Sequence, residues 1–285
     1  MGSEDMKRIV ILGAGGFVGK AMIDRLTRAG FEADPISRND IDLSDPASAP
    51  KLANKLEGAV GVIFASAITP DFARKSGQDP SEKNVMMART LTECQPVAKD
   101  LHVIYLSSDA VYGVRDGVFD EEVTPEPSDA YGTMHVTRER LLAESWPDST
   151  AIVRLSQVYG SGDTHNAYGP CRFARQALAG QPIEMFGDGE DGRDHIYIGD
   201  VTNAILAVVE TRYTGRICVS SGRSPTFQSI TEEIARHLPE IEIAKKPRSV
   251  PAIVKRFNTS RLHALGITPL SIEQGIPLLL DGLRS

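Results

Sequence analysis

The chain has 285 residues, of which 41% are hydrophobic and 24% charged, so intrinsic disorder is excluded as the default state. The net charge is −7 and no long Lys/Arg run is present, which argues against nucleic acid as a partner. The longest apolar runs, near residues 8–12 and 60–64, are far shorter than the roughly 20 residues of a membrane span.

Three cysteines, Cys94, Cys171 and Cys218, show no CxxC spacing, and their odd number argues against a disulfide framework. No signal peptide is recognisable at the start of the chain. We therefore expect a cytoplasmic protein whose thiols are buried as small apolar groups.

Short β-branched runs alternate with longer helical patterns through the first two-thirds of the chain. Strands are predicted near residues 7–12, 32–37, 60–65, 102–107 and 151–155. Helices are predicted near residues 17–29, 46–56, 81–99 and 129–146. This alternation is typical of βαβ units and predicts an α/β fold around a parallel sheet.

The alternation weakens after about residue 160, where Gly and Pro become frequent and segments 161–171 and 186–194 have loop character. We therefore divide the chain into an α/β portion at residues 7–160 and a second portion at residues 161–285. No repeat or clean linker separates the two, so we expect them to be interleaved.

Glycines stand between the first predicted strand and the first predicted helix at positions i, i+3 and i+6. The first allows a tight turn, the second lets backbone approach a pyrophosphate, and the third packs the helix on the strand. Position after a strand and before a helix makes this more than a lone glycine pattern. The cofactor-binding residues expected here are Gly13, Gly16, Phe17, Val18 and Gly19.

The second predicted strand ends at Ser37 and Arg38, beside the expected adenosine ribose. A hydroxyl and a guanidinium suit the 2′-phosphate of NADP, whereas an acidic residue would suit the 2′-hydroxyl of NAD. We therefore favour NADP and keep NAD open, because Arg38 can also be a solvated arginine. Asp42 and Leu43 follow where a side chain could reach the adenine.

Further motifs extend this pattern along most of the chain. They are Ala65-Ser66-Ala67, Asn84-Val85, Leu106-Ser-Ser108-Asp109, Pro125-x-Pro127 before Tyr131, Arg154 to Gly160, Gly187-Asp-Gly189 with Arg193-Asp194, and Asn258 to Leu262. With these residues the chain resembles the extended short-chain dehydrogenase/reductase superfamily of nucleotide-sugar epimerases, dehydratases and reductases. The resemblance implies a doubly wound parallel sheet with a smaller C-terminal portion. Residues 7–160 are then a dinucleotide-binding Rossmann domain, and residues 161–285 are mostly the substrate-binding portion. It also assigns Ala65, Ser66, Ala67 and Asn84 to the cofactor site.

The resemblance implies that Tyr131 donates the proton to a substrate carbonyl while Ser108 orients that carbonyl. In the family a lysine four residues after the tyrosine lowers the pKa of the phenol and holds the nicotinamide ribose, but here that position is His135. Histidine can bind a ribose hydroxyl and would bias Tyr131 only when charged. Glu139, four residues further on, could keep it charged, or could equally be a surface helix charge. A half-buried aromatic with an incidental histidine, as in an inactive relative, is the alternative for this pair.

The residues Asp109-Ala110 disfavour dehydration as the reaction. Dehydratases of the family carry an acidic pair at these positions, and alanine cannot act as an acid or a base. Because Arg38 suits NADPH, it favours net reduction of a substrate over epimerisation, in which the enzyme keeps NAD bound. Our leading hypothesis is NADP-dependent reduction of a keto group on a nucleotide-linked deoxysugar, with Ser108 and Asp109 on the sugar and Arg193 on the diphosphate. A nucleotide-sugar epimerase with NAD, a non-catalytic NADP-binding regulator and a reductase of simpler ketones stay open.

The expected partners are thus a small-molecule substrate, with a homodimer left open as the oligomeric state. No metal is expected, since His165 and His195 lack a Cys or His partner at metal-ligand spacing.

Overall fold

The structure is a computed structural model and describes residues 6–69, 77, 79–166 and 168–285. The chain forms two compact units. The first unit contains the described residues of Met1–Gly113, together with Thr124–Arg154 and Thr202–Ile217. The second unit contains Val114–Val123, Leu155–Val201 and Cys218–Ser285. Each unit is described below by itself.

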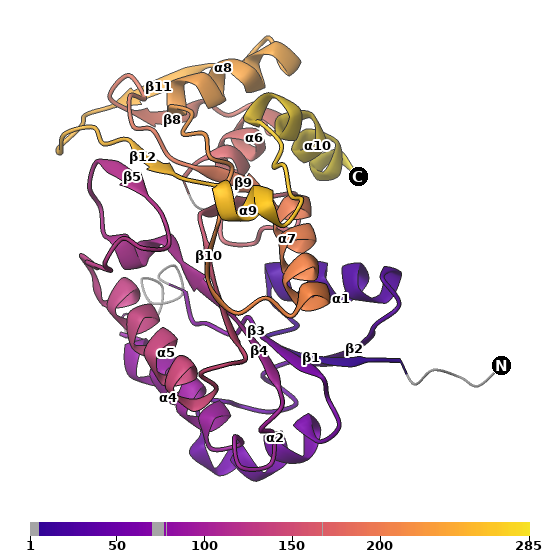
Figure 1. Cartoon of the computed structure of the whole chain (residues 1–285). Coiled ribbons are helices and arrows are strands. Elements are labelled where there is room, and N and C mark those ends of the chain that lie inside the picture. Colours follow the sequence, from indigo (N-terminus) through magenta and orange to yellow (C-terminus); the bar gives the residue numbers. More distant parts are fainter. Residues whose placement is uncertain (1–5, 70–76, 78, 167) are drawn as a thin grey trace. The chain divides into compact units, whose positions relative to one another are not determined.

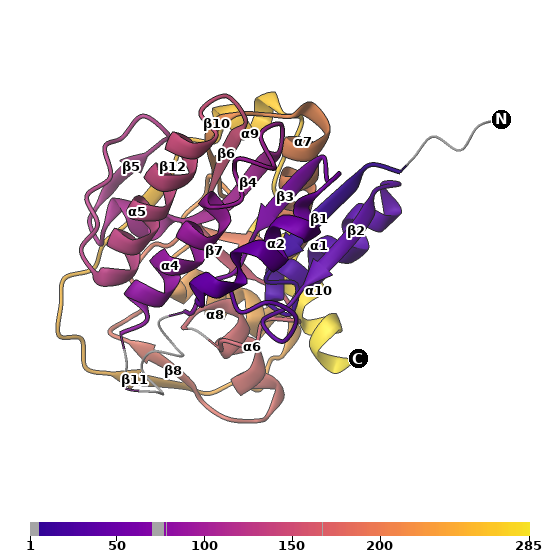
Figure 2. The same ribbon diagram turned by 90° about the horizontal axis from the view of Figure 1, so that it is seen from below.

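A six-stranded parallel sheet forms the centre of the first unit, in the order β10-β6-β4-β3-β1-β2. Its strands are β1 (Arg8–Leu12), β2 (Glu32–Ile36), β3 (Gly61–Phe64), β4 (His102–Ser108), β6 (Thr150–Leu155) and β10 (Gly215–Val219). Figure 2 shows β4, β3, β1 and β2 side by side. Strands covered on both faces are apolar throughout, and Ile9 to Leu12 are accordingly almost fully buried.

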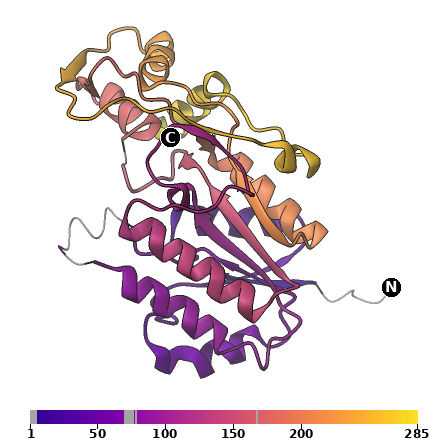
Figure 3. The ribbon, with the colours of Figure 1, turned by 60° about the vertical axis from the view of Figure 1, so that its left-hand side comes forward.

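Helices cover both faces of this sheet. They are α1 (Phe17–Arg28), α2 (Ala49–Leu56) after a short 3₁₀ turn at Pro46–Ser48, α4 (Ser81–Thr92), α5 (Ala130–Ser145) and α7 (Ile198–Thr211). In Figure 1, α1 and α7 lie on one face and α2, α4 and α5 on the other, and α4 and α5 run side by side in Figure 3. The α/β fold with a doubly wound parallel sheet is therefore confirmed.

One predicted helix is too long. The sequence pattern predicts helix over 81–99, but α4 ends at Thr92 and turns follow. Pro96 has no N–H for the carbonyl of Thr92 and its ring would clash there, which accounts for the early end.

The second unit is built from short pieces around an aromatic and aliphatic core. Its strands form two-stranded pairs: β5 (Gly117–Phe119) with β12 (Lys255–Phe257), β7 (Gln157–Tyr159) with β9 (His195–Tyr197), and β8 (Ile183–Phe186) with β11 (Ile243–Lys246). Its helices are α6 (Pro170–Leu178), α8 (Phe227–His237), α9 (Ser260–Ala264) and α10 (Ile272–Arg284). Phe173, Phe227, Ile276 and Leu279 are among the core residues. No described helix of either unit is long and apolar enough to cross a membrane.

Candidate active site

The loop between β1 and α1 depends on glycine at two positions. Gly13 has a φ of +91°, a left-handed value that favours glycine, and a Cβ on it would lie 2.7 Å from the backbone nitrogen of Ser66. A Cβ on Gly19 would lie 2.3 Å from the carbonyl oxygen of Gly13. The loop thus closes tightly over the ends of β1 and β3. The chain order reverses between these two strands, and doubly wound sheets bind ligands in the crevice at such a point.

The start of α1 suits an anion. The first N–H groups of a helix, here those of Phe17, Val18 and Gly19, have no intrahelical acceptor. The first turn contains no acidic residue, and the N-cap Gly16 makes no side-chain cap hydrogen bond. The helix dipole adds a partial positive charge at the same place. The loop and helix start together therefore fit a dinucleotide pyrophosphate, and binding by these residues stays a prediction.

Ser37 and Arg38, which follow β2, both contact aspartate side chains, and the sequence had not predicted these contacts. The Ser37 hydroxyl and N–H both donate to the Asp40 carboxylate, at 2.6 and 2.8 Å, and these bonds hold the pKa of Asp40 below its usual value. Arg38 has 63% of its side chain exposed and contacts Asp42 at 3.4 Å. Leu43 is buried in the core of the first unit. Of the predicted adenosine-side residues, Arg38 is therefore the exposed cation, while Ser37 is engaged by Asp40.

The residues after β3 are fixed by Asn84. Its side chain accepts from the Ile68 N–H at 2.8 Å and donates to the Ile68 carbonyl at 3.0 Å. Asn84 thus holds the segment that follows Ala65, Ser66 and Ala67, and its amide is turned toward backbone. Direct binding of a cofactor by Asn84 stays a prediction.

The segment carrying Ser108 meets the start of α5, which carries Tyr131. Asp129 caps α5 by accepting from the Gly132 N–H at 2.7 Å. A Cβ on Gly132 would lie 2.4 Å from the Ala110 carbonyl oxygen, so glycine permits this close approach. The Ser108 hydroxyl accepts from the Ala110 N–H at 3.1 Å and lies 3.5 Å from the Asp109 carboxylate. The predicted serine and tyrosine segments are thus neighbours in the fold.

His135 lies one turn after Tyr131 and its ring meets the Tyr131 ring edge-on, with centroids 4.6 Å apart. The side chain is 2% exposed and its Nδ1 lies 2.5 Å from the Tyr105 hydroxyl oxygen. Burial, and then the nearby Arg138 charge, lower the pKa of His135 to about 3. The imidazole is therefore neutral at physiological pH, so His135 does not supply the charge that would bias Tyr131.

Glu139 does not serve His135 and is not a surface charge. Its carboxylate is buried and paired with Arg154, at 2.7 and 3.0 Å, and it accepts from the Ser107 hydroxyl at 2.6 Å. Burial lowers the pKa of Arg154, but the bonds and charge of Glu139 outweigh burial and leave that pKa raised. This ion pair ties α5 to β6 and leaves Glu139 no free oxygen for a second cation on the helix.

A buried atom of His135 has no hydrogen-bond partner among the described residues. Nε2 of His135 makes no hydrogen bond with any described residue. Buried polar atoms nearly always have a hydrogen-bond partner, so an unpaired one indicates a place where a ligand can bind. A ribose hydroxyl would satisfy Nε2, which fits the role that the sequence predicted for His135.

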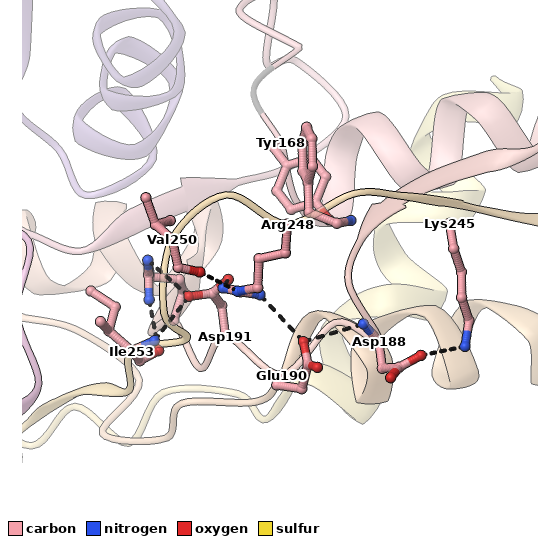
Figure 4. Close-up of polar contacts among 10 residues, drawn as sticks. Tyr168, Asp188, Glu190, Asp191, Lys245, Arg248, Val250 and Ile253 are labelled. Carbon is pink, nitrogen blue, oxygen red and sulfur yellow. Dashed lines mark hydrogen bonds and ion pairs between the residues drawn. The ribbon is translucent and has the colours of Figure 1, made fainter.

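Arg193 lies in the second unit. Figure 4 labels its neighbours Asp191 and Ile253 together with Arg248. It donates to the Ile253 carbonyl at 2.9 Å and contacts the Asp191 carboxylate at 3.4 Å. Arg248 also pairs with Asp191 and contacts Glu190 at 3.3 Å. Two guanidinium groups thus share one carboxylate. No set of three His, Cys, Asp or Glu side chains in the described part of the chain is placed to hold a metal.

A comparison with protein families decides the assignment. The model of the NAD dependent epimerase/dehydratase family matches residues 9–219, from β1 to the end of β10. The chain belongs to this family. It is the family of epimerases and dehydratases to which the sequence motifs pointed.

Individual relatives are more distant. An uncharacterized UDP-glucose epimerase of Bacillus subtilis, YtcB, is 30% identical over 164 residues, which are 55% of this chain and 51% of that protein. The match thus spans about half the length of this curated relative. The UDP-glucose 4-epimerase of Thermus thermophilus, solved with NAD, has a TM-score of 0.84 and 20% identity over 98% of this chain and 99% of its own. RMD from Pseudomonas aeruginosa, solved with NADPH, has a TM-score of 0.81 and 23% identity over 98% and 99%.

Three residues of this epimerase/dehydratase family member escaped the sequence analysis. Tyr105 lies inside an apolar strand, where it looks like core. Arg138 stands seven residues after Tyr131 on a helix, a spacing that could have placed it on the same face. Arg248 follows Lys246-Pro247 in a segment without periodicity, and its link to Arg193 through Asp191 is visible only in the fold.

Proposed function

We propose that the chain is an NADP-dependent reductase of keto groups on nucleotide-linked deoxysugars. The observation that carries this proposal is Arg38, an exposed cation just after β2. The residue at the strand end is Ser37 and not an acidic residue, which would suit NAD. A guanidinium there can pair with a 2′-phosphate. The Pseudomonas aeruginosa RMD, solved with NADPH, shares the fold and supports the proposal.

The bound cofactor would supply the hydride. The residues of the chain supply binding, orientation and the proton. The Ser108 hydroxyl makes one long contact with Asp109 and can turn to donate to a substrate carbonyl. Tyr131 gives its phenolic proton to the same carbonyl oxygen as the hydride arrives at carbon. Nε2 of His135 holds a ribose hydroxyl as a neutral group.

The substrate class is inferred from two sets of side chains. Arg193 and Arg248 present two guanidinium groups that share the Asp191 carboxylate. A diphosphate can bind the same two groups as a further anion. Ala110 after Asp109 leaves no second carboxyl for elimination of water, which disfavours dehydration.

A nucleotide-sugar epimerase that keeps NAD through each cycle is the second candidate. Asp40 and Asp42 flank Arg38 and would repel a 2′-phosphate, and the Bacillus subtilis relative is named as a UDP-glucose epimerase.

One experiment separates the two candidates. Purified protein is incubated with NADPH or NADH and a panel of nucleotide-linked 4-keto sugars, and separately with UDP-glucose without added cofactor. Stoichiometric oxidation of NADPH by a keto sugar is the expected result. Interconversion of UDP-glucose and UDP-galactose without net cofactor consumption would replace the reductase with the epimerase.

A further inference from the structure

Arg138 lies on the same face of α5 as Tyr131 and His135, because spacings of seven and three residues bring side chains to one side of a helix. The side chain is fully buried, with 0% exposure. Its Cζ lies 4.1 Å from the centroid of the Phe64 ring and 4.9 Å from that of Tyr105. The guanidinium thus lies between α5 and the rings of Phe64 on β3 and Tyr105 on β4.

This buried cation has no carboxylate partner among the described residues. Its Nη2 donates to the Ser66 carbonyl at 2.9 Å, its Nη1 reaches the Met134 sulfur at 3.9 Å, and its Nε is unpaired. The neighbouring Glu139 is held by Arg154. A buried charge is costly unless it is paired, and ring faces and a carbonyl compensate for only part of that cost. No anion among the described residues therefore neutralises the positive charge of Arg138.

A chain of contacts leads from Arg138 to Tyr131. The ring of Tyr105 lies 4.9 Å from Cζ of Arg138, and its hydroxyl oxygen lies 2.5 Å from Nδ1 of His135. The ring of His135 in turn meets the Tyr131 ring, with centroids 4.6 Å apart. Arg138, Tyr105, His135 and Tyr131 thus form one contiguous cluster.

Tyr131 responds to the same charge. Burial is the largest influence and raises its pKa to about 12, with further increases from Asp109 and Asp129. Arg138 opposes all three and lowers this pKa. Arg138 is thus the cation of this cluster, and its charge favours ionisation of the phenol.

We infer that Arg138 is a positioning residue for Tyr131: its buried, unpaired positive charge stabilises the tyrosinate left when Tyr131 gives up its proton. The inference rests on the proposed function in that Tyr131 is taken as the proton donor. In that step the Tyr131 O–H bond breaks, an O–H bond forms on the substrate, and the hydride from the cofactor forms the new C–H bond. The negative charge on Tyr131 faces Arg138 until a proton from water restores the phenol. A residue at position i+7 thereby supplies the charge that the neutral His135 lacks.

The test follows ionisation of Tyr131 directly and needs no substrate. The tyrosines are replaced by 3-fluorotyrosine, whose phenol is more acidic, and the ¹⁹F resonance of Tyr131 is identified by its loss in Tyr131→Phe. Its titration midpoint is measured in the wild type, Arg138→Met, Arg138→Gln and Arg138→Lys. Arg140→Met is the control, since Arg140 is on the same helix and its side chain is 71% exposed.

Loss of the charge should raise the midpoint by about one unit or more in both neutral variants. Arg138→Lys should stay near the wild type, and Arg140→Met should match it. Gln can still donate to the Ser66 carbonyl, so an effect limited to Met would indicate packing and overturn the inference.

Folding supplies the second readout. An apolar side chain in place of an unpaired buried cation is often neutral or stabilising, so the unfolding temperature of Arg138→Met should not fall. Unfolded Met and Gln variants would show that Arg138 is a packing residue, and an unchanged midpoint in folded variants would refute the electrostatic role. If the midpoint rises but no keto sugar is reduced, Arg138 acts as inferred and the proposed function fails instead.

Discussion

The two ends of the proposed cofactor site hold their charges in different ways. After β2, the side chains of Arg38, Asp40 and Asp42 bond to residues at most four positions away, and Arg38 is mostly exposed. On α5, Arg138 and Glu139 are buried, and they bind residues far away in the sequence, on the segment after β3 and on β6. Exposed charges are screened and adjustable, whereas buried charges are fixed by the fold. Substitutions at the α5 end should therefore have larger effects than those after β2.

Tyr131→Phe should have the largest effect. Loss of the phenolic proton donor is expected to lower kcat by about 10²- to 10⁴-fold, because general acids contribute this much. NADPH affinity should hold within about twofold, since the hydroxyl acts on the substrate. Steady-state kinetics and cofactor titration measure both, with Tyr213→Phe as the control. Full activity of Tyr131→Phe would place the proton donor elsewhere.

Glu139→Gln should destabilise the protein most. It leaves buried Arg154 without its carboxylate, which typically costs about 3–5 kcal/mol of the free energy of unfolding. Urea unfolding followed by circular dichroism measures the loss. Glu144→Gln on the same helix is the matched control, because its pair with Arg140 is exposed and worth about 0–1 kcal/mol. Equal small changes in both would mean that the buried pair is not special.

Arg38→Ala should weaken NADPH binding by about 1.5–3 kcal/mol, or roughly 10- to 150-fold, and leave NADH binding almost unchanged. The effect should shrink as salt is added, because Arg38 is exposed. Calorimetric titration of both cofactors tests this, with the exposed Arg28→Ala as the control. An unchanged ratio of the two affinities would remove the case for NADP.

His135→Gln should flatten the pH dependence of stability. The folded-state pKa of His135 is about 3, while an unfolded histidine has a pKa near 6.5. Between these values the unfolded chain binds a proton that the folded chain does not. The free energy of unfolding therefore falls as pH drops, by about 1.4 kcal/mol per unit from this residue. Unfolding at pH 7 and pH 5 should reveal a smaller difference in His135→Gln than in the wild type or in exposed His263→Gln; equal differences would mean that His135 is protonated in the fold.

The sequence predicted the parallel sheet well because buried parallel strands are continuous apolar runs, as in Ile9 to Leu12. It could not predict the short strand pairs of the second unit, since β11 (Ile243–Lys246) is mostly exposed and has no apolar pattern. The glycine loop was likewise predictable, because its constraints are local.

The environment of His135 was not predictable. It depends on Tyr105 from β4, 30 residues earlier, and on the capture of Glu139 by Arg154, 15 residues later. Helical spacing predicts Glu139 on the same face of the helix as His135, but Arg154 of β6 binds its carboxylate. Local pattern fixes which groups share a face, and tertiary contacts decide which of them pair.

The unpaired guanidinium of Arg138 makes positions 135 and 138 interdependent in any mutational route. Lysine at 135 alone would put two cations one turn apart on a buried face whose carboxylate, Glu139, is already committed. Loss of Arg138 alone would leave the Tyr131 phenol without a cation. Each single substitution should therefore impair the protein. The double variant, His135→Lys with Arg138→Ala, instead moves the positive charge by one helical turn and keeps the number of charges constant. The two positions should show strong sign epistasis, and a library that varies them singly would miss the compatible pair.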